Sequence, residues 1–181
     1  MKAATKTKQI VYTTTIETPM GNMIAGATEQ GICLLEFTER AILLQEFKDL
    51  EKLLNAEIKE GENEHFSLLK KELKEYFEGT LKKFTVPLVI VGTSFQKLVW
   101  QELLRIPYGV TRSYKEQSIA INNREAVRAV GHANGSNRIA IIIPCHRVIG
   151  DNGSLIGYGG GLLRKKRLLD LEKGQLSLTS D

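Results

Sequence analysis

Short runs of β-branched residues open the chain and alternate with turn-forming segments. Residues 10–17 are rich in Val, Ile and Thr, and residues 23–28 and 32–37 are mostly apolar, while residues 18–22 and 29–31 supply Gly, Asn and Pro between them. β-branched side chains favour strands, whereas Gly, Asn and Pro favour turns. We therefore predict that the chain begins with a small antiparallel sheet.

Helical periodicity follows this sheet. Residues 41–54 and 65–77 repeat apolar positions every three or four residues, and in the second run one stripe is formed by Leu69, Leu73, Tyr76 and Phe77. Such a stripe is typical of a helix that packs one face against a core. Strands followed by helices, without an evident catalytic pattern, predict an N-terminal α/β domain.

A break in the pattern separates this region from the second half. Pro87 and the run Gly92-Thr93-Ser94 suit a connection that ends at a helix cap. We therefore divide the chain into an N-terminal domain, 1–92, and a C-terminal domain, 93–181. Apolar recurrence from Ser94 onward predicts that the second domain begins with a helix.

Two further short helices are predicted with a tight turn between them. Ser113 and Glu116 have the spacing of a capping box, which opens a helix over 114–121. Asn123 is placed to cap a second helix over 124–134. This is the helix-turn-helix pattern, so we expect a mainly α C-terminal domain.

The second of these helices combines small apolar residues with basic ones. The predicted buried stripe consists of Ala126, Ala129, Val130 and Ala133, and the exposed basic face consists of Arg124, Arg128 and His132. A small, basic helix surface lets the backbone approach a nucleic-acid duplex closely. It is equally consistent with a crowded helix crossing and solvated arginines.

The run 139–143 is the most apolar in the second half and precedes Pro144 and Cys145. Its isoleucines predict a strand buried on both faces, which Pro144 would end. Positive charge on His146 and Arg147 would lower the pKa of the Cys145 thiol and make it reactive. A free cysteine after an apolar run is also often a small core residue. Both interpretations stay open on these residues alone.

Composition narrows the class of protein. The chain has 181 residues, 42% hydrophobic and 25% charged, without an apolar run of membrane-spanning length. No apolar signal segment follows the lysine-rich residues 1–8, so we expect a cytoplasmic protein. The two cysteines, Cys33 and Cys145, do not have metal-ligand spacing with any histidine, so we expect neither a metal nor a disulfide. The net charge of +4 arises in the second half, which suits a polyanionic partner.

Taken together, the motifs of the second half resemble one family, the O6-alkylguanine-DNA alkyltransferases, also called methylated-DNA–protein-cysteine methyltransferases. The motifs that carry the resemblance are Phe95-Gln96, Val99-Trp100, Ile106-Pro107-Tyr108-Gly109, Ser113-Tyr114, Arg128-Ala129-Val130-Gly131, Asn137, Pro144-Cys145-His146-Arg147-Val148, Gly157-Tyr158 and Gly160-Gly161-Leu162. The resemblance implies an α/β N-terminal domain with a ribonuclease-H-like antiparallel sheet, packed on a winged helix-turn-helix domain. It also implies a monomer that needs no cofactor.

The same resemblance implies a reaction and its residues. Cys145 would take the alkyl group from guanine O6 and keep it as a thioether in a single turnover. His146 would deprotonate the thiol through a water molecule, and Glu172 would orient the imidazole. Tyr114 would donate a hydrogen bond to the departing guanine, and Asn137 would hold the strand that carries Cys145 against the adjacent turn.

The resemblance also implies how guanine is held. Backbone atoms of Tyr158 and Gly159 would face O6, and the carbonyl groups of Cys145 and Val148 would bind the exocyclic amine. Gly159 and Gly160 would leave the pocket lip open, from which we expect tolerance of groups bulkier than methyl.

Double-stranded DNA containing O6-alkylguanine is the partner that the resemblance implies. Arg128 would fill the space left by a flipped nucleotide while its helix lies in the minor groove. The residues expected to touch or closely approach DNA are Arg128, Ala126, Val127, Gly131, Asn123 and Ser94.

Two other classes of function remain possible from the residues. A helix-turn-helix protein could bind alkylated DNA without repairing it, although relatives that only flag lesions lack the thiol. A cysteine hydrolase would turn over and leave no persistent adduct on the protein.

Overall fold

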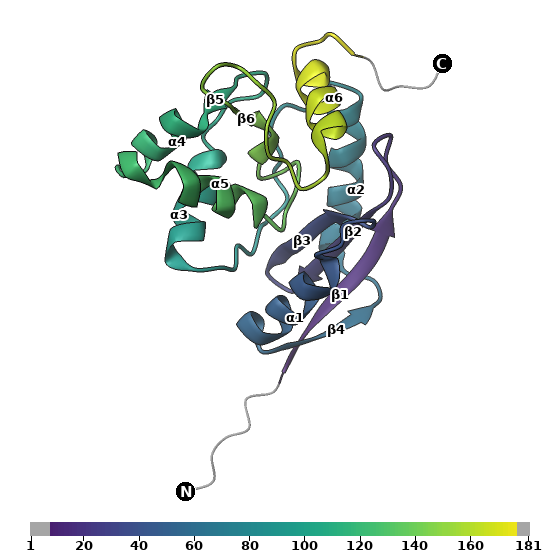
Figure 1. Cartoon of the computed structure of the whole chain (residues 1–181). Helices are drawn as coiled ribbons and strands as arrows, with labels where there is room; N and C mark the ends of the chain where they lie inside the picture. The colour runs from purple at the N-terminus through teal and green to yellow at the C-terminus, as the bar shows by residue number, and fades with distance from the viewer. Residues whose placement is uncertain (1–7, 177–181) are drawn as a thin grey trace, which may run out of the picture.

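The chain folds into two lobes, one built on a sheet and one mainly helical (Figure 1). This computed structural model describes residues 8–176. In the N-terminal lobe, β1 (Gln9–Ile16), β2 (Met23–Thr28) and β3 (Gly31–Phe37) form the predicted antiparallel meander. A fourth strand, β4 (Ala56–Glu60), pairs parallel to β1, so the order is β3-β2-β1-β4. β3 therefore lies at an edge of the sheet.

Two helices accompany the sheet. α1 (Leu43–Leu54) and α2 (Glu64–Phe77) lie within two residues of their predicted bounds. α2 begins after Asn63, whose side chain accepts a hydrogen bond from the backbone N–H of His65. β4 was not predicted because three of its five residues are charged, so it lacks the pattern of a buried strand. Pairing with β1 stabilises it instead.

The helices of the C-terminal lobe begin where their caps predict. α3 (Ser94–Leu103) is preceded by a capping box between Thr93 and Gln96. α4 (Tyr114–Ala120) is preceded by the predicted capping box between Ser113 and Glu116. In each box the side chains satisfy backbone N–H groups that a helix start leaves without partners.

The second helix of the helix-turn-helix differs in detail from the prediction. A 3₁₀ turn, η1 (Arg124–Ala126), comes first, and α5 (Val127–Gly135) follows it. The Asn123 side chain makes no capping hydrogen bond. Ala129 is exposed, so its place in the buried stripe is wrong. A 3₁₀ turn has three residues per turn, which rotates the following residues away from the face that a continuous α-helix would bury.

The isoleucine run is not the strand that its composition predicts. Residues 139–143 are buried but form successive turns, and Ile141 has φ +73°. One bridge attaches the run to the edge strand β3: Leu35 N–H donates to Arg138 O, and Ala140 N–H donates to Leu35 O, both at 2.8 Å. β-branching thus indicated burial correctly, whereas the surrounding packing determined the backbone conformation.

The remaining elements complete the C-terminal lobe. η2 (Cys145–Arg147) leads into β6 (Val148–Ile149), which pairs parallel with β5 (Arg112–Ser113). α6 (Leu162–Glu172) lies beside α2 of the other lobe (Figure 1). Within residues 8–176, no helix is long and apolar enough to cross a membrane.

One hydrophobic core runs through both lobes. At its centre the Trp100 indole is buried and donates to Ala133 O at 2.7 Å, which joins α3 to α5. The connecting segment pairs with β3: Ile32 N–H donates to Pro87 O, and Val89 N–H donates to Ile32 O, both at 2.8 Å. The edge strand therefore contacts both the connection and the isoleucine run.

Glu72 offers a test of this connection. Its buried carboxylate accepts from the Thr85 N–H at 2.8 Å, from the Thr85 hydroxyl and from the Val86 N–H at 3.1 Å. Glu72→Ala leaves these donors without a partner and should lower the free energy of unfolding by about 2 kcal/mol. Glu51→Ala, at an exposed position on α1, should change it by less than about 0.5 kcal/mol. If urea unfolding gave the same loss of free energy for both variants, Glu72 would not stabilise the segment that connects the lobes.

Candidate active site

Cys145 begins η2 and is only 7% exposed. Burial raises the pKa of its thiol to about 11, against the opposing effect of a hydrogen bond from Asn137. The expectation that His146 and Arg147 lower this pKa is therefore wrong for the free protein. Burial outweighs nearby positive charge, and Arg147 is paired elsewhere. The resting group is a protonated thiol.

Asn137 holds the turn that carries the cysteine. Its Oδ1 accepts from Ile139 N–H at 3.0 Å, while Nδ2 donates to Ile143 O at 2.8 Å and lies 3.3 Å from Cys145 Sγ. One amide thus spans both ends of the isoleucine run and reaches the sulfur. The structure brings this predicted residue to the thiol, although the segment it holds is a turn.

Glu172, the last residue of α6, is the polar centre of the site. Its side chain is fully buried and accepts from the Tyr76 hydroxyl and from His146 Nε2, each at 2.7 Å. Arg147 donates through Nε at 2.8 Å and Nη2 at 3.0 Å, and Gly109 N–H donates at 3.1 Å. Although burial opposes ionisation, the adjacent His146 and Arg147 hold the pKa of this carboxyl well below its usual range. The carboxylate is therefore ionised.

This carboxylate determines the state of His146. Burial lowers the pKa of the imidazole, and the neighbouring carboxylate opposes that shift only in part. A carboxylate can only accept, so Nε2 carries the proton and Nδ1 presents a lone pair. Nδ1 is buried and has no hydrogen-bond partner among residues 8–176. The predicted pairing of His146 with Glu172 is thus present, and its free nitrogen can accept a proton.

Tyr114 lies at the start of α4, between α5 and the loop after β6. Its hydroxyl is within hydrogen-bonding distance of Ile156 O at 3.1 Å and Gly157 O at 3.2 Å. Burial, with a smaller effect of Cys145, raises the pKa of the phenol to about 12. Tyr114 is therefore a protonated hydrogen-bond donor.

The two carbonyl groups expected to bind guanine already have one partner each. Val148 O accepts from the Lys165 ammonium, and Cys145 O accepts from Val148 N–H. Lys165 is fully buried, which lowers its pKa to about 8, and it also donates to Ile156 O and Gly157 O. A carbonyl oxygen has two lone pairs, so each can accept a further hydrogen bond.

A small cavity adjoins the thiol. Cys145 and Asn137 line it together with Tyr158, Gly159 and Arg40, and its volume is about 10 Å³. That is roughly the space of one water-sized probe, so guanine cannot enter without movement. Tyr158 and Gly159 thus lie where the sequence places them, beside Cys145.

The lip of this cavity is not open. A Cβ placed on Gly159 would lie 2.5 Å from Arg40 Cζ, and one placed on Gly160 would lie 2.9 Å from the Phe37 ring. Side chains from the end of β3 and the residues after it therefore occupy the space that two glycines were expected to leave free. The expectation that Gly159 and Gly160 leave the lip open, from which we predicted tolerance of alkyl groups bulkier than methyl, is therefore wrong.

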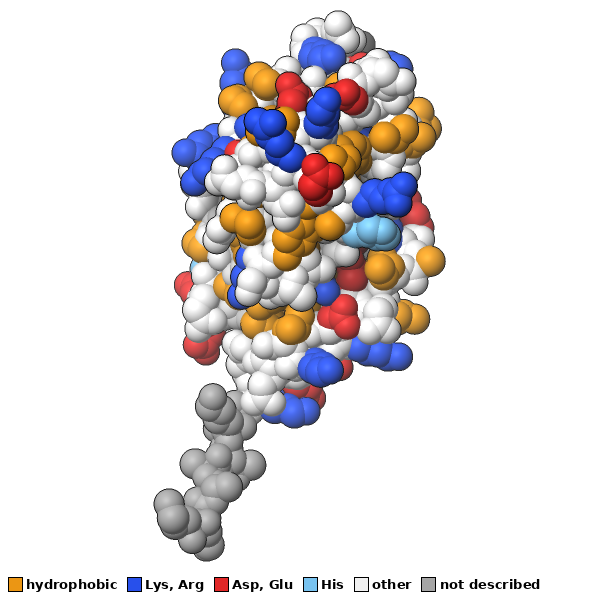
Figure 2. Space-filling model, turned by 60° about the vertical axis from the view of Figure 1, so that its left-hand side comes forward, with side chains coloured by type: hydrophobic (Ala, Val, Ile, Leu, Met, Phe, Trp, Pro, Cys, Tyr) orange, Lys and Arg blue, Asp and Glu red, His pale blue; other side chains and the backbone are white. Residues whose placement is uncertain are grey.

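An open groove of about 710 Å³ lies next to this cavity, and Gly135 lines both. Of the predicted DNA contacts, Val127, Arg128 and Gly131 line the groove, whereas Ala126, Asn123 and Ser94 lie outside its lining. Arg128 is exposed. Figure 2, in which the left-hand side of Figure 1 comes forward, shows Lys and Arg side chains interspersed with hydrophobic and acidic ones.

Three polar residues of the site were missed by the sequence analysis. Lys165 lay within a basic run, yet it shares a helical stripe with Leu168, Leu169 and Glu172, which was a usable signal of burial. Tyr76 was assigned only to an apolar stripe. Arg40 follows a strand of the other lobe, and nothing in its local pattern connects it with Cys145.

Metal ligation is not suggested by the described residues. Within residues 8–176, no three or more His, Cys, Asp or Glu side chains are grouped so that they could hold a metal ion. Cys33 and Cys145 are both free, and burial raises the pKa of Cys33 to about 12. Of these two thiols, Cys145 is the one that lies next to Asn137 and His146.

Comparison with known proteins covers both lobes. Residues 11–90 match the family described as 6-O-methylguanine DNA methyltransferase, ribonuclease-like domain, and residues 94–174 match the DNA binding domain of the same name. The methylated-DNA–protein-cysteine methyltransferase of Methanosarcina barkeri is 43% identical over 92% of this chain and 99% of its own length. That of Mycobacterium leprae is 56% identical over 66% of this chain and 72% of its own length.

Solved structures agree with the sequence comparison. The crystal structure of Mycobacterium tuberculosis OGT in complex with DNA has a TM-score of 0.76 and 42% identity, and covers 92% of this chain and 94% of that chain. Likeness therefore extends through both lobes, the α/β lobe as well as the helix-turn-helix lobe. The chain belongs to the methylated-DNA–protein-cysteine methyltransferase family.

Proposed function

We propose that this protein repairs DNA by moving the alkyl group of an O6-alkylguanine onto its own Cys145, once per molecule. The observation that carries the proposal is the buried pair of Glu172 with His146, the residue next in the chain to Cys145, whose cavity shares Gly135 with the groove of α5. Relatives named for transfer from methylated DNA to a protein cysteine support the same chemistry.

The proton leaves the thiol first in the proposed reaction. Neutral His146 accepts it at Nδ1 through a bridging water, and the carboxylate of Glu172 stabilises the resulting imidazolium. A pKa of about 11 for the resting thiol means that few molecules carry a thiolate before substrate is bound. The buried pair of His146 and Glu172 supplies the base that this thiol needs.

Displacement at the alkyl carbon follows. The Cys145 sulfur forms a bond to that carbon as the carbon–O6 bond breaks, and the electron pair of the broken bond goes to the guanine. The Tyr114 hydroxyl donates a hydrogen bond to the ring as negative charge develops. Overall, one proton leaves the thiol and guanine gains one. Removal of the alkyl group would require a nucleophile to displace the Cys145 thiolate, a poor leaving group from an uncharged thioether, so the alkyl group stays on sulfur and the protein is consumed.

Access to the target base requires DNA distortion. The O6 atom lies inside a duplex, so the nucleotide must be flipped out, which costs a few kcal/mol. Arg128 projects from α5 into the open groove and is suited to fill the vacated position. Gly131 and Val127 border the same groove and let the helix backbone come close to the minor groove. A solved relative bound to DNA supports this partner.

A mass measurement tests the reaction itself. Incubation with a duplex containing one O6-methylguanine should add one methyl group per protein, located on Cys145 by peptide mass. Cys145→Ala should abolish the addition but still bind the duplex, because Arg128, which is proposed to enter the duplex, lies on α5 and does not depend on the thiol. Bound lesion without added mass would favour a protein that only flags damage, and repeated turnover without an adduct would favour a hydrolase.

A second experiment tests base flipping. Arg128→Ala should slow methyl transfer from duplex DNA by at least about tenfold while slowing reaction with free O6-methylguanine base much less, because only the duplex requires flipping. Arg124→Ala removes the same charge outside the groove lining and serves as the matched control. Equal slowing with both substrates in Arg128→Ala would rule out the flipping role.

A further inference from the structure

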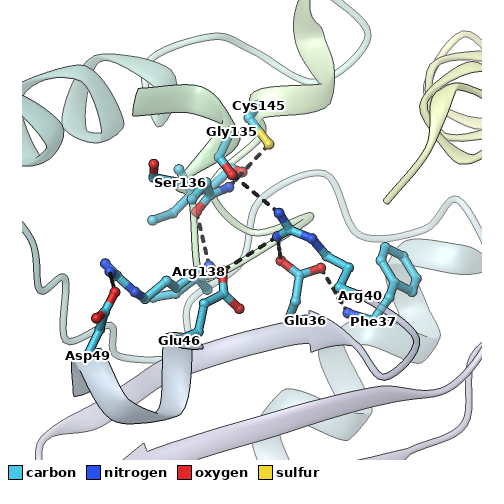
Figure 3. Close-up of polar contacts among 12 residues, drawn as sticks. Glu36, Phe37, Arg40, Glu46, Asp49, Gly135, Ser136, Arg138 and Cys145 are labelled. Carbon is cyan, nitrogen blue, oxygen red and sulfur yellow. Dashed lines mark hydrogen bonds and ion pairs between the residues drawn. The ribbon is translucent and has the colours of Figure 1, made fainter. Parts of the chain in front are cut away.

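Arg40 reaches the reactive cavity from the other lobe. It lies three residues beyond β3, and its backbone N–H donates to Phe37 O at 3.2 Å. Its Nη2 donates to Gly135 O at the end of α5 at 3.3 Å, and only 11% of its side chain is exposed. Figure 3 shows its guanidinium between the carboxylates of the N-terminal lobe and the segment that carries Cys145.

Two buried carboxylates flank this guanidinium. Glu36 is 1% exposed, pairs with Arg40 Nη1 and also accepts from Phe37 N–H at 2.9 Å. Glu46 is 2% exposed, and its Oε1 lies 3.6 Å from the same Nη1. Among residues 8–176 neither oxygen of Glu46 has a hydrogen-bond partner. A buried carboxylate without hydrogen bonds costs free energy. Glu46 is therefore a second carboxylate with which the Arg40 guanidinium can pair if it moves away from Glu36.

The guanidinium also forms a wall of the cavity beside the thiol. It stands where a side chain on residue 159 would stand, since a Cβ there would lie 2.5 Å from Arg40 Cζ. Arg40, Gly159 and Cys145 line the same space of about 10 Å³. Any alkyl group that approaches the sulfur past Gly159 must therefore displace Arg40.

We propose that Arg40 is a specificity-determining residue for the alkyl transfer, because its guanidinium closes the Gly159 side of the cavity and must move toward Glu46 to admit the alkyl group. This rests on the proposed function. A larger group requires a larger displacement from the ion pair with Glu36, so Arg40 penalises groups in order of size.

Transfer rates from duplexes that carry O6-methyl-, O6-ethyl- or O6-benzylguanine test the proposal. The benzyl-to-methyl rate ratio should rise by about tenfold or more in Arg40→Ala, since extra carbon atoms in a confined pocket carry penalties of that order. Arg105→Ala, on an exposed side chain of the same type, should leave the ratio unchanged. An unchanged ratio in Arg40→Ala overturns the proposal.

Removal of Arg40 leaves Glu36 buried without its partner, so the double variant Arg40→Ala with Glu36→Gln is measured in parallel and should show the same rise. Should neither variant fold, Arg40→Lys, which is shorter and keeps the charge, should raise the ratio by a smaller amount. The same ratio as in the unaltered protein would contradict the proposal.

A thermal-melting experiment tests the contact without any chemistry. Gly159→Ala should lower the Tm of the unaltered protein because the new methyl group meets Arg40, and should lower it less in the Arg40→Lys background. Equal losses in both backgrounds would overturn the contact. If the unaltered protein transfers no methyl group, the proposed function fails; transfer with a size ratio insensitive to residue 40 contradicts only the role of Arg40.

Discussion

A single buried carboxylate organises the reactive end of this protein. Glu172 accepts hydrogen bonds from Tyr76, from Gly109 and from the neighbouring His146 and Arg147, which belong to three separate segments of the chain. A buried charge is tolerated only when it is paired and hydrogen-bonded, so each donor stabilises it and is positioned by it. Tyr76 comes from α2, and the same contact therefore joins the two lobes.

The ionisation of this group links stability to pH. The pKa of Glu172 in the folded protein lies below its ordinary value of 4.5. Its contribution to stability is therefore complete above that ordinary value and is lost as the pH falls through the lowered pKa. The pKa of His146 is also lowered, so acid favours the unfolded chain through this residue too, beginning near its ordinary value of 6.5. Both groups therefore lower the free energy of unfolding as the pH falls.

The N-terminal lobe takes part in the site as well as supporting it. Its edge strand β3 binds the isoleucine run through Leu35, and Arg40, just beyond the strand, contacts the cavity beside Cys145. An exposed sheet edge invites association with other chains, and here the connection and the isoleucine run cover it. The segment that carries the thiol is thus held by contacts from both lobes.

Local signals in the sequence predicted the local features of this fold. The capping box of Ser113 and Glu116 marked the start of α4, the run Gly92-Thr93-Ser94 marked that of α3, and the motif resemblance predicted the pairing of His146 with Glu172. Features set by distant contacts were not predictable. The isoleucine run turns where a strand was expected, the pKa of the Cys145 thiol is raised by burial, and Arg40 meets Gly159 across more than a hundred residues.

The protonation state of His146 is the central claim, because the proposed chemistry needs a neutral imidazole with its proton on Nε2. Nitrogen-15 NMR of histidine-labelled protein reports both, with His146 assigned by comparison with His146→Gln. The predicted result is a ring that is neutral and protonated on Nε2 at about pH 8 and that gains its second proton with a pKa below the ordinary 6.5. A ring that gains its second proton with a pKa at or above 6.5, or that carries its proton on Nδ1, would contradict the account.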